Sequence, residues 1–345
     1  MAQAIATELE IKADFLPQKE NLDSLYFGGG TPSVLDETEL KWIFEAVHRQ
    51  FSFREGAEIT LEANPEDITE EQVAIWKGLG INRLSIGVQS FFADDLEWMN
   101  RQHSPDQARQ AVEIARKEGI DLISVDLIFG LPYSTPERWA ANVNQALALG
   151  VQHLSFYSLT VEEKTALAHQ VKKGKIELPK EESYSEQYLF AHHRLQEAGF
   201  EHYEVSNYAL PGFRAVHNSS YWEGQPYLGI GPSAHGYDGK VRYWNHAHNV
   251  RYLDDVNAGK YPEADREMLS PEDLYHDYLI THLRHIMGIN LAHIEQNWVP
   301  DWREHFGEKV HELKGQHMLI QDGDTLRMTP EGWMVSDHVI GEFFL

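Results

Sequence analysis

The chain has 345 residues, a mass of 39.6 kDa and a formal charge of −25, with 42% hydrophobic and 24% charged residues. This length predicts about two domains with a large core, and so acidic a chain argues against nucleic acid or an anionic membrane surface as a partner. The chain contains no cysteine, which excludes disulfides, a thiolate nucleophile and a cysteine-ligated zinc ion or iron–sulfur cluster on these residues.

No apolar run approaches the roughly 20 residues that cross a bilayer. The N-terminal residues also lack a basic segment followed by an apolar stretch, so no signal peptide is visible. We therefore expect a cytoplasmic protein without stable membrane insertion.

The first half of the chain alternates short apolar runs with amphipathic helical patterns. The apolar runs predict strands at residues 25–27, 58–63, 83–88, 122–128 and 153–157. The helical patterns between them cover about residues 37–50, 70–79, 105–118 and 136–149. Apolar strands that alternate with helices predict an α/β fold with a parallel sheet, either open or closed as a barrel.

Four of these strands end in glycine or polar residues. The carboxyl ends of parallel strands face one common rim, where ligands bind. Any one of the polar residues could serve as a turn or a helix cap, but four strands together favour a shared binding site. The residues concerned are the glycines and threonine at 28–31, Glu62, Asn64, Gln89 and Asp126.

The pattern changes after about residue 200. Residues 201–249 are rich in Tyr, Trp, His, Asn and Gly and lack a helical period, which predicts loops with short strands. Helical patterns return at about residues 271–286, 291–297 and 302–314. A hairpin is predicted at about 318–328 and a final helix at about 330–343. Helices followed by a hairpin indicate a small winged-helix-like module at the C-terminus.

Five motifs of the first half occur together in a recognisable order. They read GGGTP at 28–32, LEANPEDIT at 61–69, INRLSIGVQSF at 81–91, NRQHS at 100–104 and DLIFGLPYST at 126–135. Together they resemble the radical S-adenosylmethionine (SAM) enzymes related to oxygen-independent coproporphyrinogen III oxidase. Three later motifs are similar to the heme-chaperone branch of that family, the HemW proteins: HLSFYSLTVEEKTALA at 153–168, YEVSNYA at 203–209 and HNSSYWEGQPYLGIGPSAHG at 217–236.

The resemblance implies a partial parallel (β/α)6 radical-SAM barrel with SAM across its carboxyl rim. The residues that match the family's SAM site are Gly29, Gly30, Thr31, Glu62, Gln89, Arg101 and Asp126. The first three would contact the methionine part of SAM, Glu62 would hold its amino group, and the last three would meet its carboxylate or ribose. Without the resemblance, a surface ion pair for Arg101 and a helix cap for Asp126 would be the simpler interpretations.

The departure from the family lies at the N-terminus. Family members open with a strand and a Cys-x3-Cys-x2-Cys loop that holds three irons of a [4Fe–4S] cluster, whereas residues 1–16 resemble the helix after that loop. With that first strand and the cysteines missing, we expect no cluster and no radical chemistry. Two interpretations stay open, a shortened form of an ordinary member and a natural cluster-free paralogue. A homodimer contact or a swapped segment could cover the uncovered strand edge at 25–27.

The chain also carries a second candidate site, at the motif HNSSYW. The resemblance implies that His217 is an axial heme ligand and that Tyr221 and Trp222 pack on the porphyrin or bond its edge. His235 is a further candidate ligand. In the structural alternative, His217 caps backbone carbonyls and Trp222 anchors the second domain. We expect this site outside the barrel strands, and we expect His192 at the surface.

The leading hypothesis is a heme-binding and heme-trafficking chaperone of the HemW type, which would hand heme to an acceptor such as a respiratory-chain protein. SAM would bind weakly, because the iron that chelates it is absent. One alternative is a coproporphyrinogen oxidase-like radical SAM enzyme whose cluster segment is missing from this chain. Another is a non-catalytic SAM-binding scaffold. The expected domains are a truncated barrel, an aromatic- and glycine-rich connecting region and a C-terminal helical, winged-helix-like domain, at 1–205, 206–265 and 266–345.

Overall fold

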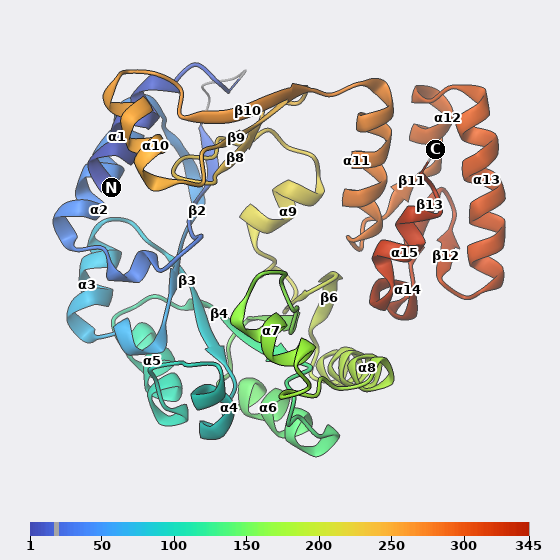
Figure 1. The fold of residues 1–345 in the computed structure, drawn as a ribbon, viewed down its shortest axis with the longest axis horizontal. Coiled ribbons are helices and arrows are strands. Elements are labelled where there is room, and N and C mark those ends of the chain that lie inside the picture. Colours follow the sequence, from blue (N-terminus) through green and yellow to red (C-terminus); the bar gives the residue numbers. More distant parts are fainter. Residues whose placement is uncertain (17–20, 345) are drawn as a thin grey trace.

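A curved seven-stranded sheet forms the larger part of the protein (Figure 1). The computed structural model describes residues 1–16 and 21–344. Within these residues, parallel strands follow in chain order as β1 (Leu22–Phe27), β2 (Phe53–Ala63), β3 (Arg83–Gln89), β4 (Leu122–Phe129) and β5 (His153–Ser158). The sheet continues with β7 (Asn207–Ala209), which is antiparallel to β5, and ends with β6 (Glu201–Glu204). The predicted fold class, an α/β fold with a curved and mostly parallel sheet, is confirmed.

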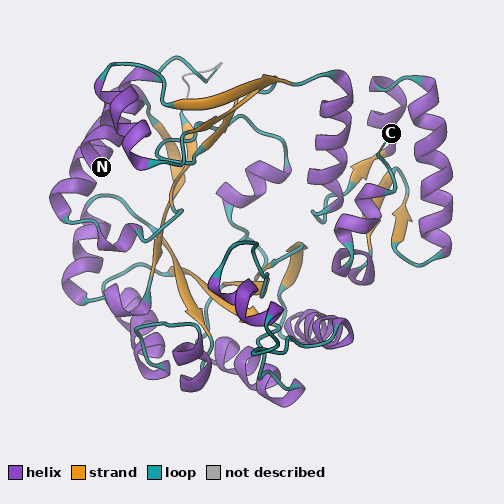
Figure 2. Cartoon of the chain, viewed as in Figure 1, coloured by secondary structure: helices purple, strands orange, loops and turns teal. Residues whose placement is uncertain are grey.

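Helices cover the convex face of this sheet (Figures 1 and 2). They are α2 (Glu37–Gln50), α3 (Glu70–Gly78), α5 (Pro105–Lys117), α6 (Pro136–Ala148) and α8 (Glu181–Glu197). Connecting segments form η1 (Pro32–Val34), η2 (Pro65–Asp67), α4 (Ala93–Trp98) and α7 (Ala166–Lys172). Asp36 and Ser104 begin α2 and α5 with capping boxes, which satisfy backbone amides that a helix leaves free at its start. Apolar side chains, including the fully buried Trp76 and Trp139, fill the space between helices and sheet.

The concave side of the sheet holds a helix that the sequence pattern did not predict. This helix, α9 (Val216–Trp222), lies inside the curve of the sheet and contacts β1 (Figure 1). A helix of two turns is too short to show a hydrophobic period. A distant carboxylate, that of Glu58 on β2, accepts hydrogen bonds from its first amides. The expectation of loops and short strands over 201–249 is therefore wrong at this helix.

A second sheet packs against the N-terminal helix. Its antiparallel strands are β8 (His235–Tyr237), β9 (Val241–Asn245) and β10 (Glu263–Met268), and α10 (Asn249–Asn257) connects the last two. The N-terminal helix, α1 (Ala2–Ile11), contacts α2 and α10. The helix predicted over residues 1–16 therefore ends earlier, at Ile11. Glu8 and Lys12, both fully buried, bond to side chains of β9 and α10.

The C-terminal part contains helices followed by a hairpin, as the sequence predicts. Its elements are α11 (Pro271–Leu283), β11 (Ile289–Asn290), α12 (Leu291–Asn297), α13 (Pro300–Gly315), β12 (Leu319–Asp322), β13 (Thr325–Met328), α14 (Pro330–Met334) and α15 (Ser336–Gly341). The three strands form a small antiparallel sheet in the order β11-β13-β12. The single helix predicted for 330–343 is instead two helices, because Val335 departs from helical geometry with φ −118° and ψ 32°.

One histidine lies deeper than expected. His192 on α8 is 6% exposed, and its Nδ1 is 2.8 Å from Nδ1 of His202 on β6. The expected surface position is wrong because α8 packs this side chain against the edge of the main sheet. In the parts of the chain that the structure describes, no helix is both long and apolar enough to cross a membrane.

Candidate functional site

A cavity of about 280 Å³ opens where the parallel strands reach their carboxyl ends. The structure brings together all the residues proposed for SAM binding. Six of them line the cavity, and the seventh, Gly29, donates its amide to the Glu62 carboxylate at 3.3 Å. The six lining residues are Gly30, Thr31, Glu62, Gln89, Arg101 and Asp126.

The glycine loop after β1 permits a close backbone approach to this cavity. Gly29 and Gly30 have φ values of 76° and 143°, where a side chain would strain the backbone. At Gly28, a Cβ atom would lie 2.7 Å from Oε1 of Glu62, closer than a real contact allows. Glycine at these positions lets the loop present free backbone groups beside a carboxylate.

Glu62 is the acidic group nearest to this loop. Its Oε1 accepts a hydrogen bond from the Tyr26 hydroxyl at 2.8 Å, and its Oε2 accepts from the amide of Gly29. Burial and the neighbouring charges of Glu62 and Asp126 raise the pKa of Tyr26, so its hydroxyl keeps its proton and acts as a donor. A carboxylate has about four lone-pair positions, so Glu62 retains capacity for a cationic ligand.

Asp126 lies deeper in the same cavity, on β4. The Ser85 hydroxyl donates to both of its oxygens at 3.0 and 3.2 Å, and the Ser124 hydroxyl donates at 3.3 Å. Burial raises its pKa to about 6, partly offset by hydrogen bonds from Ser155 and Ser85, while the charge of Glu62 adds to the rise. Asp126 is therefore a carboxylate at neutral pH that retains affinity for a donor such as a hydroxyl.

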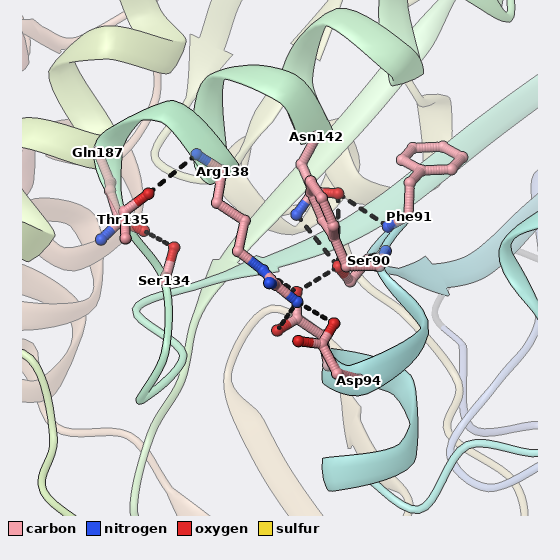
Figure 3. Close-up of polar contacts among 10 residues, drawn as sticks. Ser90, Phe91, Asp94, Ser134, Thr135, Arg138, Asn142 and Gln187 are labelled. Carbon is pink, nitrogen blue, oxygen red and sulfur yellow. Dashed lines mark hydrogen bonds and ion pairs between the residues drawn. The ribbon is translucent and has the colours of Figure 1, made fainter.

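Gln89 and Arg101 occupy the loop side of the cavity. Gln89 has φ 66°, which is unusual for a residue with a side chain, and Arg101 donates from Nη1 to Oδ1 of Asn64 at 3.3 Å. The turn after Gln89 is fixed by the network drawn in Figure 3. There Ser90 receives a hydrogen bond from Asn142 at 3.1 Å, and Oδ1 of Asn142 accepts from the amide of Phe91 at 2.8 Å.

The same network ties this turn to α4. The Ser90 hydroxyl donates to Asp95 at 2.6 Å, and Arg138 on α6 binds both Asp94 and Asp95. Arg138 thereby connects the start of α6, after β4, with the start of α4, after β3. These contacts hold two neighbouring rim loops in one arrangement.

The helix α9 places His217 next to the rim cavity. The His217 imidazole stacks on the Tyr26 ring, with centroids 4.6 Å apart and planes 17° apart. Its Nδ1 lies 3.0 Å from the Ser24 hydroxyl and its Nε2 lies 3.1 Å from the Tyr221 hydroxyl. Burial lowers the pKa of His217 to about 4, so the ring is neutral at pH 7. The motif lies outside the strands, as expected, but it is close to the rim cavity, because α9 folds into the concave side of the sheet and stacks His217 on the cavity residue Tyr26.

The carboxylate of Glu58 on β2 holds the start of α9. Its two carboxylate oxygens accept hydrogen bonds from the amides of Val216 and His217, each at 3.0 Å. Arg83 lies 3.5 Å from the same carboxylate, and both side chains are buried. The position of His217 is thus set by a buried ion pair on β2 and β3.

The other heme candidates occupy different surroundings. Trp222 lies near the carboxyl of Glu204, which accepts a hydrogen bond from the amide of Ser206 at 3.3 Å and whose pKa burial raises to about 7. His235 is exposed on β8, with its ring 6.2 Å from that of Trp244. The structure therefore brings His217 and Tyr221 together, places Trp222 at the end of α9 near Glu204 and places His235 in the second sheet. Among the described residues, no group of three His, Asp or Glu side chains is arranged to hold a metal ion.

Several residues of the site escaped the sequence analysis. Tyr26, Ser85 and Tyr157 line the cavity, and Glu58 holds α9. Ser85 could have been predicted, because it pairs with Glu62 across β2 and β3 and therefore lies on the same face of the sheet. The contact between Glu58 and α9 joins positions 158 residues apart, which no local pattern shows.

Comparisons with known proteins agree with this architecture. Residues 5–146 match the radical SAM superfamily, and residues 269–335 match the HemN C-terminal domain. Coproporphyrinogen III oxidase HemN of Escherichia coli has a similar fold, with a TM-score of 0.82 over 99% of this chain and 81% of that chain at 22% identity. At this identity, the likeness concerns the fold alone.

The sequence relatives are more specific. The chain is 33% identical to the heme chaperone HemW of Lactococcus lactis over 94% of its own length and 86% of that protein. It is 34% identical to the heme chaperone HemW of Mycobacterium tuberculosis, over 98% of this chain and 84% of that protein. It is also 34% identical to the mitochondrial radical S-adenosyl methionine domain-containing protein 1 of Danio rerio, over 96% of this chain and 77% of that protein. The chain therefore belongs to the HemW family within the radical SAM superfamily.

Proposed function

We propose that this protein binds heme at His217 and passes it to an acceptor protein, and that it binds SAM in the rim cavity. The observation that carries the heme proposal is the state of His217. Its imidazole is neutral, its ring is held by Tyr26, and its Nε2 lies 3.1 Å from the Tyr221 hydroxyl, an exchangeable partner. Neutral imidazole is the form that ligates iron, and a partner on the other ring nitrogen orients it.

The second nitrogen of His217 supports this assignment. A hydrogen bond from Nδ1–H to the Ser24 hydroxyl would leave the lone pair on Nε2. A heme iron could then replace the Tyr221 hydroxyl at Nε2, and that hydroxyl could bond a heme propionate or a solvent molecule. Heme would supply a planar apolar surface and an iron centre, and the chain would supply one axial ligand with a fixed ring plane.

The chemistry of the rim cavity fits SAM. Glu62 suits its ammonium group, Arg101 its carboxylate, and Asp126 a ribose hydroxyl. The exposed backbone of Gly29 and Gly30 suits the extended methionine part. When bound, SAM would contribute a positively charged sulfonium beside these acids. The residues of this chain would bind and orient it.

The same residues provide no thiolate for a [4Fe–4S] cluster, because the sequence contains no cysteine. We therefore propose that heme and SAM bind without a cluster, and that SAM binds more weakly than it does when an iron chelates it. Loss of that anchor would move affinity from about micromolar toward about millimolar. After anaerobic reconstitution, iron and sulfide should stay near background, whereas about four of each per chain would contradict this part of the proposal.

The decisive experiment is a heme titration followed at the Soret band. The wild type should bind heme saturably, and His217→Ala should shift the band and weaken binding. His235→Ala serves as the matched control and should behave as the wild type, because His235 is exposed in the second sheet. Failure of the wild type to saturate would remove the heme function and leave a SAM-binding scaffold. Identical behaviour of His217→Ala and wild type would exclude His217 as the ligand.

The acceptor and the oligomeric state follow from the same proposal. A heme chaperone needs an apoprotein acceptor, and we propose one of the respiratory chain. β1 forms an edge of the main sheet and could be covered in a homodimer. Mixing the heme-loaded protein with an apo-acceptor should transfer the Soret absorbance, and sedimentation of the heme-loaded protein should reveal the dimer.

A further inference from the structure

Tyr26 belongs to both candidate sites. Its hydroxyl donates to Oε1 of Glu62 in the rim cavity at 2.8 Å, while its ring stacks on His217 at 4.6 Å. Ser24, two residues earlier on β1, contacts Nδ1 of the same histidine. One strand therefore orients the imidazole of one site and contacts the carboxylate of the other.

We propose that Tyr26 is a positioning residue that sets the ring plane of His217 for the heme iron and couples it to occupancy of the rim cavity; this inference rests on the proposed function. An imidazole bonds iron along its nitrogen lone pair, which lies in the ring plane. The stack with Tyr26 fixes that plane, and the Ser24 contact fixes rotation within it. The direction of an iron–Nε2 bond would thus be determined largely by β1.

The coupling follows from the hydrogen bonds of Glu62. Glu62 accepts from Tyr26 and from the amide of Gly29, and it can accept from an ammonium group as well. A ligand on Glu62 would lie over the Tyr26 hydroxyl and restrict the movement of that side chain. Since Tyr26 would already be ordered, fixing His217 on its face would cost less conformational entropy.

A ligand that orders Tyr26 at one site favours binding at the other, so the coupling is positive. SAM in the cavity should tighten heme binding, and heme should tighten SAM binding by the same factor, because coupling between two sites is reciprocal. We expect a factor of about five, which is at the lower end of ordinary coupling between sites. Removal of the Tyr26 hydroxyl should abolish the coupling, and removal of its ring should disturb the heme ligation itself.

The test is a set of heme titrations with and without SAM, with SAM present at several times its own measured dissociation constant. The wild type should bind heme about five times more tightly with SAM. Tyr26→Phe keeps the stack and loses the bond to Glu62, so its two titrations should coincide. Tyr26→Leu also loses the stack, so its heme affinity should fall with or without SAM, and its ferric electron paramagnetic resonance spectrum should change with the imidazole orientation.

The matched control is Tyr261→Phe. Tyr261 is exposed between α10 and β10 and does not line the rim cavity. This variant should keep the SAM effect on heme affinity. Thermal unfolding followed by circular dichroism checks that each variant is folded, and Tyr26→Phe decides the question if Tyr26→Leu does not fold.

The outcomes separate this inference from the proposed function. Absence of saturable heme binding in the wild type overturns both. Heme binding that depends on His217 but does not change with SAM overturns the inference alone. The same holds if Tyr26→Phe keeps the full effect of SAM, or if Tyr261→Phe loses it as completely as Tyr26→Phe.

Discussion

Glu8 on α1 and Glu62 on β2 both have polar partners, but protein groups enclose Glu8 completely, whereas Glu62 faces a cavity. The two oxygens of Glu8 are bonded to Lys12 at 3.0 Å, to Asn245 at 2.6 Å, to Tyr252 at 2.7 Å and to the amide of Gly231 at 2.7 Å. Glu8 and Lys12 are fully buried. Glu62 accepts two hydrogen bonds and faces a cavity that also contains Asp126.

The difference separates a structural cluster from a binding site. Around Glu8, protein groups occupy the positions at which a carboxylate accepts, and Lys12 neutralises its charge. Burial lowers the pKa of Lys12, while the charge of Glu8 and a hydrogen bond to it act in the opposite direction. In the rim cavity, the carboxylates of Glu62 and Asp126 can each accept further hydrogen bonds. A cationic or hydrogen-bond-donating ligand would therefore be stabilised there.

The largest effect should come from breaking the closed cluster. Lys12→Met keeps most of the apolar stem but leaves Glu8 as an unpaired buried charge, so the free energy of unfolding should fall by about 3–5 kcal/mol. Lys41→Met is the control, because Lys41 pairs with Glu37 on the exposed face of α2 and should cost at most about 0.5 kcal/mol. Urea unfolding measures both. A loss for Lys12→Met no greater than for the control would contradict the structural role of this cluster.

A second prediction concerns Glu204, whose buried carboxyl accepts a hydrogen bond from the amide of Ser206 at 3.3 Å. Its pKa of about 7 in the folded protein exceeds the ordinary value of 4.5, so the folded state holds the proton more tightly. The free energy of unfolding should therefore fall as pH rises from about 4.5 to about 7, by up to about 3 kcal/mol. Glu204→Gln should lack this decrease.

Urea titrations at about pH 5 and about pH 8 test the linkage. The stability of Glu204→Gln relative to wild type should increase between the two conditions. Glu201→Gln is the control, since Glu201 is partly exposed and pairs with Arg214. Parallel pH dependence of Glu204→Gln and wild type would show that Glu204 does not titrate in this range.

The third prediction sharpens the contrast at Glu62. Glu62→Gln should weaken SAM binding by about 2 kcal/mol, or about 30-fold, because a hydrogen bond to a charged group is lost. It should change the free energy of unfolding by less than about 1 kcal/mol, because a carboxylate that faces a cavity contributes little to packing. Calorimetry with SAM and urea unfolding report the two quantities. Glu10→Gln, at an exposed ion pair with Arg49, should leave SAM affinity unchanged.

The smallest effect is expected for heme binding as a function of pH. An ordinary histidine protonates near pH 6.5, but burial holds the pKa of His217 at about 4. Heme affinity should therefore change by less than about two-fold between about pH 8 and about pH 5.5. Soret titrations at several pH values measure it. A steep loss of affinity centred near pH 6.5 would point to a different, solvent-exposed histidine as ligand.

Much of the main sheet was predictable from local patterns. The parallel strands contain short apolar runs, and helices with clear caps separate them, so each predicted segment lies inside one of the strands β1 to β5. Residues at strand ends were also predictable as neighbours, because parallel strands direct their carboxyl ends to one edge. The resemblance of the motifs supplied the family, and the sequence relatives confirm it.

Contacts between distant segments were not predictable in this way. Helix α9 is too short to show a period, and its position depends on Glu58, far away in the sequence. His192 looked like a surface residue of an acidic helix, but packing of α8 against β6 buries it beside His202. The burial of Lys12 likewise depends on distant residues, because Asn245 and Tyr243 surround its side chain.

The amino-acid sequence was enough to predict the strands and helices of the main sheet, the shared rim of polar strand ends and, through its motifs, the family. Hydrophobic periodicity, helix caps and glycine turns depend on residues that are close in the sequence, so they can be predicted from it. The stack of His217 on Tyr26, through which the two candidate sites share a side chain, is visible only in the folded protein. That contact joins β1 to α9 across the concave side of the sheet, and such long-range packing depends on the whole fold because no local preference specifies it.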